Sequence, residues 1–401
     1  MNRLKTDVLI AGAGMVGSAV ALGAARLGYN VLLLEPKELN PHQATPASDI
    51  NGFDQRVSAL THASVQLLTR LGVWDAVDSY SLPYRRMDVW DGRGNGRIVF
   101  DADEIYRQEL GVIVENQRVA AALHHKLSQH KNIGVINDSL QKWQVDINGA
   151  ELTTASGQAI LCQLFLGADG ANSLSRRLLA LPTREWDYGQ EAMVATIRTA
   201  RSHQRIACQQ FLASGPLALL PLQDADDSGR YSSLVWSVDV EMLPRYRNLR
   251  DEEFLKALGD ASDYRLGIIE EVSPRLSFPL RQRHAKQYIA HHSAILGDAA
   301  HTIHPLAGQG VNLGFDDVAV ILHELARARQ KQMNPGYTEL LRRYQRSRQP
   351  ANLAMMAAME GFKRGFGSDA KWLTWLRNQG LNQVNQLMPV KKILMKRAMG
   401  I

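Results

Sequence analysis

Three glycines near the N-terminus, Gly12, Gly14 and Gly17, have the spacing of a phosphate-binding turn. In such a turn the first glycine permits a tight bend, the second lets the backbone approach a pyrophosphate, and the third lets the following helix pack closely on a sheet. The N–H groups at the start of that helix then face the phosphate. The spacing therefore predicts a dinucleotide site.

An acidic residue downstream supports the same interpretation. Residues 31–34 form an apolar run that ends at Glu35. A carboxylate at the end of the second strand accepts hydrogen bonds from ribose hydroxyls and repels a 2′-phosphate. We therefore expect a strand over 8–11, a helix over 16–27 and a second strand that ends at Glu35, which together bind an unphosphorylated adenosine ribose.

The same N-terminal run also imitates a secretory signal or a short membrane span. Residues 8–25 carry no charged side chain and follow Arg3 and Lys5. However, the three glycines interrupt the run, and a strand that ends in Glu35 follows it. These two features favour the nucleotide fold over a signal sequence.

Two further glycine–acid clusters lie far along the chain, each after an apolar strand. They occupy residues 167–176 (GADGANSLSR) and 297–305 (GDAAHTIHP). A nicotinamide dehydrogenase needs only the first glycine motif, whereas a cofactor with a long polyhydroxylated arm needs further donors and acceptors along its length. Asp169, taken alone, has the alternative interpretation of a turn former, and the other clusters favour a binding role.

The three clusters, in this order and spacing, resemble those of the class A flavoprotein monooxygenases of the para-hydroxybenzoate hydroxylase type, over the whole chain. Within that class, residues 297–315 (GDAAHTIHPLAGQGVNLGF) are similar to the corresponding run of the hydroxylases of ubiquinone biosynthesis. Residues 87–91 and 194–199, with the pair His304 and Pro305, most resemble the 2-octaprenylphenol hydroxylases of that family. Sister enzymes that act at other ring positions are close alternatives.

The resemblance implies an α/β fold with a Rossmann-type FAD-binding domain, an interleaved sheet-rich substrate domain and C-terminal helices. The predicted boundaries are 1–75, 116–180 and 281–330 for the discontinuous FAD-binding domain, 76–115 and 181–280 for the substrate domain, and 331–401 for the helical region. Helical periodicity predicts helices over 311–330, 337–363 and 371–399, with breaks at Gly380 and Pro389.

Transferred position by position, the resemblance implies a set of FAD contacts. Glu35 binds the adenosine ribose, Arg56 lies beside the pyrophosphate, and Asp298 accepts hydrogen bonds from the ribityl hydroxyls. Asn116 or Gln117 contacts the ribityl chain.

The remaining implied contacts involve the second and third clusters. Asp169 and Arg176 organise the second cluster. A helix that begins near Val311 would direct N–H groups and a positive dipole end toward the flavin ring, which favours the reduced anion. The residues whose backbone is expected at the isoalloxazine ring are Gly308, Gly310, Val311 and Asn312.

The activity that the resemblance implies is the FAD-dependent insertion of one oxygen atom from O₂ into a polyprenylated phenol, with NAD(P)H as a transient co-substrate and a flavin C4a-hydroperoxide as the reactive species. Glu35 does not decide between NADH and NADPH, because it serves FAD. The sequence assigns no catalytic residue and no proton acceptor for the phenol.

Three other functions are compatible with parts of this pattern. A prenyl reductase or a halogenase would share the FAD fold, but the Trp-rich lysine signature of halogenases is absent. A non-catalytic prenyl-binding carrier would keep the fold without FAD, and the intact glycines and Glu35 argue against it. A metal site of Asp298, His301 and His304 would lie on a loop and lack a fourth ligand, so we expect no metal and a packed His301.

Composition bounds the remaining possibilities. The 401 residues are enough for two or three domains, and 45% hydrophobic with 21% charged residues are ordinary globular values. A net charge of +6 is too weak to imply nucleic acid. The chain has only two cysteines, Cys162 and Cys208, and neither has another Cys or a His at the spacing of metal ligands. This argues against a disulfide scaffold and a zinc site and favours a cytoplasmic location.

The C-terminal stretch leaves two interpretations open. Residues 387–401 combine apolar side chains with Lys391, Lys392 and Lys396, a composition suited to anionic lipid or an acidic partner. This interpretation predicts peripheral contact with the inner membrane or a ubiquinone-biosynthesis complex, and we also expect a homo-oligomer. The alternative is a final helix packed on the FAD-binding domain with its lysines in water. Residues 342–348 are expected to form a solvated helix face.

Overall fold

A computed structural model describes residues 3–42, 47–146, 149–303, 310–367 and 371–400 of the chain. Its first sheet is mainly parallel and is built around β1, whose residues 8–11 are almost fully buried. Burial on both faces explains why this strand is a continuous apolar run rather than an alternating pattern. In order across the sheet, the strands are β8 (Ile133–Ile136), β2 (Val31–Leu34), β1 (Leu4–Ala11), β11 (Ala159–Gly167), β19 (Ser293–Ile295) and β18 (Ile289–Ala290).

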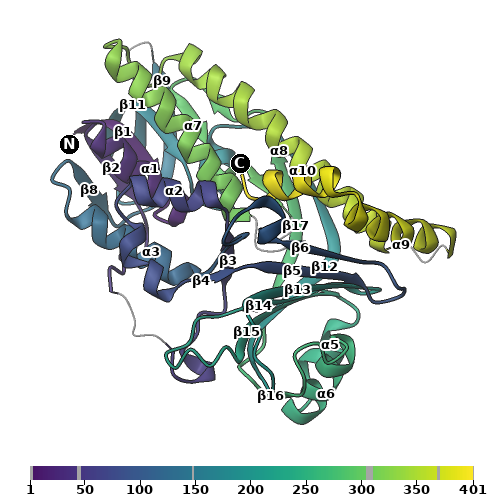
Figure 1. Cartoon of the computed structure of the whole chain (residues 1–401). Coiled ribbons are helices and arrows are strands. Elements are labelled where there is room, and N and C mark those ends of the chain that lie inside the picture. Colours follow the sequence, from purple (N-terminus) through teal and green to yellow (C-terminus); the bar gives the residue numbers. More distant parts are fainter. Residues whose placement is uncertain (1–2, 43–46, 147–148, 304–309, 368–370, 401) are drawn as a thin grey trace.

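An antiparallel arm extends this sheet at β11. The arm consists of β9 (Leu140–Asp146) and β10 (Gly149–Thr154), and β10 pairs with β11. Three helices lie beside this parallel sheet (Figure 1): α1 (Met15–Arg26), α2 (His62–Arg70) and α3 (Asn116–Ser128).

Helix α1 accounts for the apolar run that imitates a signal sequence. Every residue over 17–25 is buried, because α1 lies between the parallel sheet and the neighbouring helices α3 and α7 (Gly310–Gln330). A helix that is enclosed on all sides is apolar on all sides. Over the residues that the structure describes, no helix is long and apolar enough to cross a membrane.

The second sheet is larger and mostly antiparallel. Its strands, in order, are β20 (His301–Thr302), β17 (Leu276–Ala285), β12 (Thr183–Thr199), β15 (Tyr231–Asp239), β14 (Gly215–Pro221), β13 (Ile206–Leu212), β5 (Arg86–Asp91) and β6 (Arg97–Asp101), with β16 (Ile269–Val272) also paired to β12. One face packs on α5 (Leu243–Arg247) and α6 (Asp251–Ala261), around Trp236 and Phe254 (Figure 1). The other face contacts Ala59 and Ile113 of a small third sheet.

The third sheet joins the two larger ones. It consists of β3 (Val57–Leu60), β7 (Gly111–Glu115) and β4 (Leu82–Tyr84), all antiparallel. The strands therefore cross the expected boundaries in three places: β3 pairs with β7, β17 spans residue 281, and β20, from the expected FAD-binding segment, pairs with β17. The division of the chain into domains stays a prediction.

The C-terminal helices are α7, α8 (Thr338–Gly367), α9 (Lys371–Gln386) and α10 (Met388–Ala398). The predicted break at Gly380 is wrong, because α9 continues through it. The break falls at Leu387, and Pro389 lies in the first turn of α10, where a missing N–H is tolerated.

The expectation of a solvated face over 342–348 is wrong for two of its residues. Tyr344 and Arg348 are buried, and Asn352 continues the same face one turn later. Residues spaced by four lie on one side of a helix, and this side of α8 packs on α7 and on the edge strand β18. The charged residues over 342–348 suggested an exposed helix face. In the fold, neighbouring elements cover the side that carries Tyr344 and Arg348.

Candidate functional site

The three glycine clusters and Glu35 meet at one edge of the parallel sheet. Gly12 follows β1, Glu35 follows β2, Ala168 follows β11, and Gly297 lies two residues after β19. These four strands are neighbours and run parallel, so their carboxyl ends lie side by side. Open α/β sheets bind ligands at this edge. The structure thus brings together motifs that are almost 300 residues apart in the chain.

Direct packing joins the first cluster to the second. Gly12 has a φ of +95°, and a Cβ there would lie 2.5 Å from the Ala168 carbonyl oxygen. A Cβ on Gly17 would lie 1.8 Å from the Gly12 carbonyl oxygen. Both positions therefore need glycine for the turn, the helix and the sheet to pack.

Val16 joins the first cluster to the third. Its Cγ2 atom lies 3.2 Å from where a Cβ of Gly297 would stand, and 2.6 Å from that of Gly314 in α7. The absence of side chains at these two glycines lets α1, the third cluster and α7 approach one another closely.

Gly14 is different, because packing does not require it. It is the N-cap residue of α1, it is exposed, and a Cβ there would meet no atom within 4 Å. The space in front of the helix N-terminus is therefore open, as the approach of a pyrophosphate requires. This glycine fits the cofactor expected from the sequence.

The Glu35 carboxylate lies against the glycine turn. It accepts hydrogen bonds from the N–H of Ala13 at 2.8 Å and from the N–H of Lys37 at 3.2 Å. His124 of α3 contacts the other side of the turn, with Nε2 2.8 Å from the Ala13 carbonyl oxygen and Nδ1 3.2 Å from that of Asn40. The sequence pattern did not single out His124.

Arg56, Asn116 and Asp298 lie on the same side of the site. The Asn116 N–H donates to the Arg56 carbonyl oxygen at 2.9 Å, and the Asn116 side chain accepts a hydrogen bond from Ser58 at 2.6 Å. The Asp298 carboxylate is accessible, yet the surrounding protein limits its hydration and raises its pKa, against the opposing effect of His301 and Arg56. A carboxylate that a ligand can reach, but that surrounding protein partly shields from water, is suited to accept hydrogen bonds from ribityl hydroxyls.

Asp169 serves the second cluster itself. Its carboxylate accepts hydrogen bonds from the Ser173 hydroxyl and from the Ser175 N–H, at the start of the short helix α4 (Leu174–Leu178). Buried Arg176 donates to the carbonyl oxygens of Ala171 and Ala299, at 3.0 and 2.8 Å. Arg176 therefore ties the second cluster to the third.

The predicted flavin loop is described only from Gly310 onward, and Gly308 and His304 lie outside the described residues. Gly310 begins α7, and Val311 follows in its first turn. The Asn312 side chain accepts hydrogen bonds from the Thr61 N–H and the Ser64 hydroxyl and donates to the Ala59 carbonyl oxygen. The Asn312 side chain thus anchors α7 to neighbouring elements. Any contact of Asn312 with the cofactor would therefore be made by its backbone.

His301 is packed, and its Nε2 is engaged. Nε2 lies 2.6 Å from the Asp317 carboxylate, and both side chains are buried. Over the described residues, no group of three histidine, cysteine or acidic side chains is arranged to hold a metal ion.

Gln209 is a polar residue that the sequence pattern missed. It lies in β13, opposite Ala218 in β14, and Ala218 belongs to the apolar cluster with Ala59 and Ile113. Gln209 therefore faces the side of the second sheet that is turned toward the third sheet. The side chain is buried, and its Oε1 has no hydrogen-bond partner in the part of the chain that the structure describes. Such an acceptor is costly unless a ligand supplies a donor.

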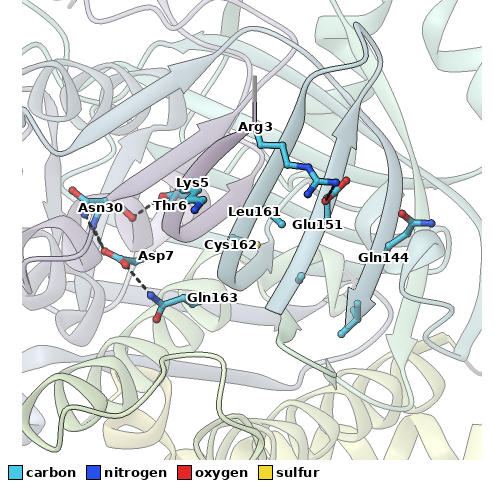
Figure 2. Close-up of a pocket in the computed structure, with 12 residues that line it drawn as sticks. Arg3, Lys5, Thr6, Asp7, Asn30, Gln144, Glu151, Leu161, Cys162 and Gln163 are labelled. Atoms are coloured by element: carbon cyan, nitrogen blue, oxygen red, sulfur yellow. Dashed lines mark hydrogen bonds and ion pairs between the residues drawn. The ribbon is translucent and has the colours of Figure 1, made fainter. Parts of the chain in front are cut away.

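A pocket also lies at the amino-terminal ends of β1 and β11, away from this site (Figure 2). Arg3 and Glu151 form an ion pair across it at 3.4 Å, and Asp7 accepts hydrogen bonds from Asn30 and Gln163. None of the predicted site residues lines it. The amino-terminal edge of a parallel sheet is opposite the one that binds ligands.

The fold and this edge define a class of flavin enzymes, which comparison with known proteins supports. The family described as an FAD binding domain matches residues 5–359, so the chain belongs to this family and is an FAD-dependent monooxygenase. PqsL of Pseudomonas aeruginosa has a similar structure, with a TM-score of 0.76 at 19% identity over 94% of this chain and all of that one. The p-nitrophenol 4-monooxygenase PnpA of Pseudomonas putida also has a TM-score of 0.76, at 15% identity over 100% and 98% of the two chains. The predicted fold class and FAD are confirmed.

Closer relatives identify the branch of the family. The chain is 36% identical over 403 residues to 3-demethoxyubiquinol 3-hydroxylase of Escherichia coli, with both chains covered completely. It is 33% identical to ubiquinone hydroxylase UbiL of Rhodospirillum rubrum, over 98% of this chain and 89% of the relative. The resemblance to ubiquinone-biosynthesis hydroxylases is confirmed.

Proposed function

We propose that this chain hydroxylates the aromatic ring of a polyprenylated phenol in ubiquinone biosynthesis, with FAD as its resident cofactor and NAD(P)H and O₂ as co-substrates. The observation that supports this proposal most directly is the meeting of the three glycine clusters and Glu35 at one sheet edge. Relatives named as ubiquinone hydroxylases match the chain along its whole length.

The described residues have complementary roles toward FAD in this proposal. The turn at Gly14 and the N-terminus of α1 bind the pyrophosphate, Glu35 binds the adenosine ribose, and Asp298 accepts hydrogen bonds from the ribityl chain. Arg56 and Asn116 flank the same side, and the start of α7 approaches the flavin ring. When bound, FAD supplies the redox chemistry between NAD(P)H, O₂ and the ring, and the protein supplies placement and the exclusion of water.

Gln209 is the proposed contact for the phenol. Its Oε1 is a buried acceptor without a partner among the described residues, next to apolar side chains that suit a prenylated ring. The ring hydroxyl donates a hydrogen bond to Oε1, which orients the ring without removing its proton, because an amide oxygen is a weak base.

Three further parts of the proposal concern the setting of the enzyme. A polyprenyl chain partitions into a bilayer, so the enzyme works at the cytoplasmic surface of the inner membrane. Membership of a ubiquinone-biosynthesis complex and a homo-oligomeric state also stay proposals.

A labelling experiment tests the function. The purified protein, reconstituted with FAD, is supplied with NADH or NADPH, ¹⁸O₂ and a short-chain prenylphenol that is soluble in water. We expect an oxidised-flavin absorption spectrum and a product that contains one ¹⁸O atom. A protein that binds the prenylphenol but no FAD would be a carrier, and NAD(P)H oxidation without ¹⁸O in the ring would also contradict the proposal.

A further inference from the structure

Helix α10 has one apolar face that is buried. Met395 and Met399 pack with Ala102, Ile105 and Leu110, residues of the η4 turn (Ala102–Ile105) and the segment that follows it. The last helix is therefore held mainly by the 102–110 segment, whereas one sequence interpretation expected it to pack on the FAD-binding domain.

An ion pair reinforces this attachment. The Lys391 ammonium group lies 2.6 Å from the Glu104 carboxylate, and the Lys391 side chain is only 3% exposed. The expectation that all the lysines of this stretch lie in water is wrong for Lys391. Removal of residues 387–401 would break these contacts, so the function of the helix has to be tested by point substitutions on its outer side.

The outer side of α10 exposes a second apolar face. We call this face the outer patch; its members are Leu387, which directly precedes α10, and Val390, Ile393 and Leu394 of α10, which are between 44% and 64% exposed. Spacings of three and four residues place these side chains on one side of the helix. Tyr106 is 91% exposed, and the Lys392 ammonium group lies 5.4 Å above its ring. Several exposed apolar side chains on one side of a helix mark an interaction surface.

Basic side chains border the outer patch. Lys392 and Lys396 come from α10 itself, and exposed Arg107 follows Tyr106. An apolar helix face with lysines beside it, and a tyrosine at its margin, has the composition of helices that lie in the interface of an anionic bilayer. The lysines match the headgroup charge, and the apolar side chains reach the acyl boundary.

The same charges argue against a second copy of the chain as the occupant. A two-fold interface would place the outer patch of one copy on that of the other and would bring the basic borders of the two copies, which include Lys392 and Lys396, close together. Like charges across an interface disfavour association. From this juxtaposition of apolar face and basic border, we infer that the outer patch docks the enzyme on an anionic lipid bilayer.

The inference rests on the proposed function only for its purpose, which is to place the enzyme where a polyprenyl substrate resides. It is tested with the FAD-loaded full chain and vesicles of phosphatidylcholine with or without phosphatidylglycerol. The test variant is Val390→Ser/Ile393→Ser/Leu394→Ser, and the matched control is Ile268→Ser, which changes an apolar side chain that is 67% exposed elsewhere. A second variant, Lys392→Gln/Lys396→Gln, tests the charge.

We expect the wild type and Ile268→Ser to cosediment with the phosphatidylglycerol vesicles. The triple variant should bind these vesicles at least about tenfold more weakly. The lysine variant should lose most of the dependence on phosphatidylglycerol and on salt. Turnover of the water-soluble prenylphenol should be equal in all variants, so a failure of vesicle binding is distinguishable from a failure of the hydroxylase proposal. Equal vesicle binding by the triple variant overturns the inference, as does a wild-type dimer that the triple variant dissociates.

Discussion

His301 and Asp317 form a buried pair that connects the third glycine cluster to α7, with Nε2 and Oδ2 2.6 Å apart. The same Oδ2 accepts the Gly297 N–H at 2.9 Å, and Oδ1 accepts a hydrogen bond from Nε of Arg348 at 2.7 Å. Burial acts to raise the pKa of Asp317, but His301 and Arg348 outweigh it and lower the pKa below its ordinary value. The Asp317 carboxylate, which belongs to α7, therefore fixes the positions of the third glycine cluster and α8 relative to α7.

Asp317→Asn is expected to destabilise the fold and to weaken FAD binding. The substitution leaves the Arg348 cation buried without its counter-charge, a change that costs about 3–5 kcal/mol. The measurements are denaturant unfolding of the FAD-free protein and titration of FAD. Asp316→Asn is the control, because Asp316 is more exposed and contacts Arg348 at 3.4 Å. Equal stability of the two variants would mean that the Asp317 network is not what holds the loop.

Gly14→Val should remove FAD binding and leave the fold intact. The side chain would enter the open space before α1, where the pyrophosphate is expected, and the loss of two hydrogen bonds to a charged group weakens binding by about 3 kcal/mol or more. Gly17→Ala is the contrasting variant, since its Cβ would collide with the Gly12 carbonyl oxygen and destabilise the protein itself. Normal flavin content in Gly14→Val would refute a phosphate at this turn.

Asp298→Ala should weaken FAD binding by about tenfold to a hundredfold, because a hydrogen bond to an ionised acceptor contributes about 1.5–3 kcal/mol. Asp298→Asn keeps one acceptor oxygen and should lose less. Fluorescence titration of the apoprotein with FAD measures both effects, and thermal unfolding checks that the fold persists. If Asp298→Ala binds FAD as tightly as the wild type, the ribityl role is incorrect.

Gln209→Leu should raise the KM for the prenylphenol about twofold to tenfold, with FAD content unchanged, since a neutral hydrogen bond contributes about 0.5–1.5 kcal/mol. Gln210→Leu provides the control: Gln210 points to the opposite face of β13, and its amide donates to Asp263 at 2.8 Å. That variant should lose stability without a change in KM. An unchanged KM in Gln209→Leu would remove Gln209 from the substrate site.

Stability is expected to fall as the pH decreases from about 6.5 to about 4, partly because of His284. Burial, followed by the effect of His301 and Arg184, lowers the pKa of His284 to about 4. In this window the unfolded chain binds the proton and the folded chain does not, so the folded state loses up to about 3 kcal/mol toward pH 4. His284→Gln should flatten the pH dependence of the unfolding free energy, whereas exposed His125→Gln should not. Parallel curves for wild type and His284→Gln would contradict this assignment.

The sequence by itself determined the nucleotide-binding turn, its helix and the acid that follows the second strand. These signals are local: the spacing of Gly12, Gly14 and Gly17 is set by the backbone of one turn, and Glu35 ends a strand that its apolar residues predict. The same local logic predicted strands before the other two clusters. Their role in binding FAD came from their resemblance to known flavoproteins.

Only the tertiary structure decided which polar side chains are internal. Arg348, Lys391 and Gln209 are buried because partners from distant elements cover them or receive their hydrogen bonds. Neither their residue type nor their position in the helical or strand period predicts this burial. The side chain of Asn312 likewise anchors α7 to the turn at Thr61, 251 residues away. Burial is a property of the neighbours that folding brings together, and a pattern along one segment does not contain those neighbours.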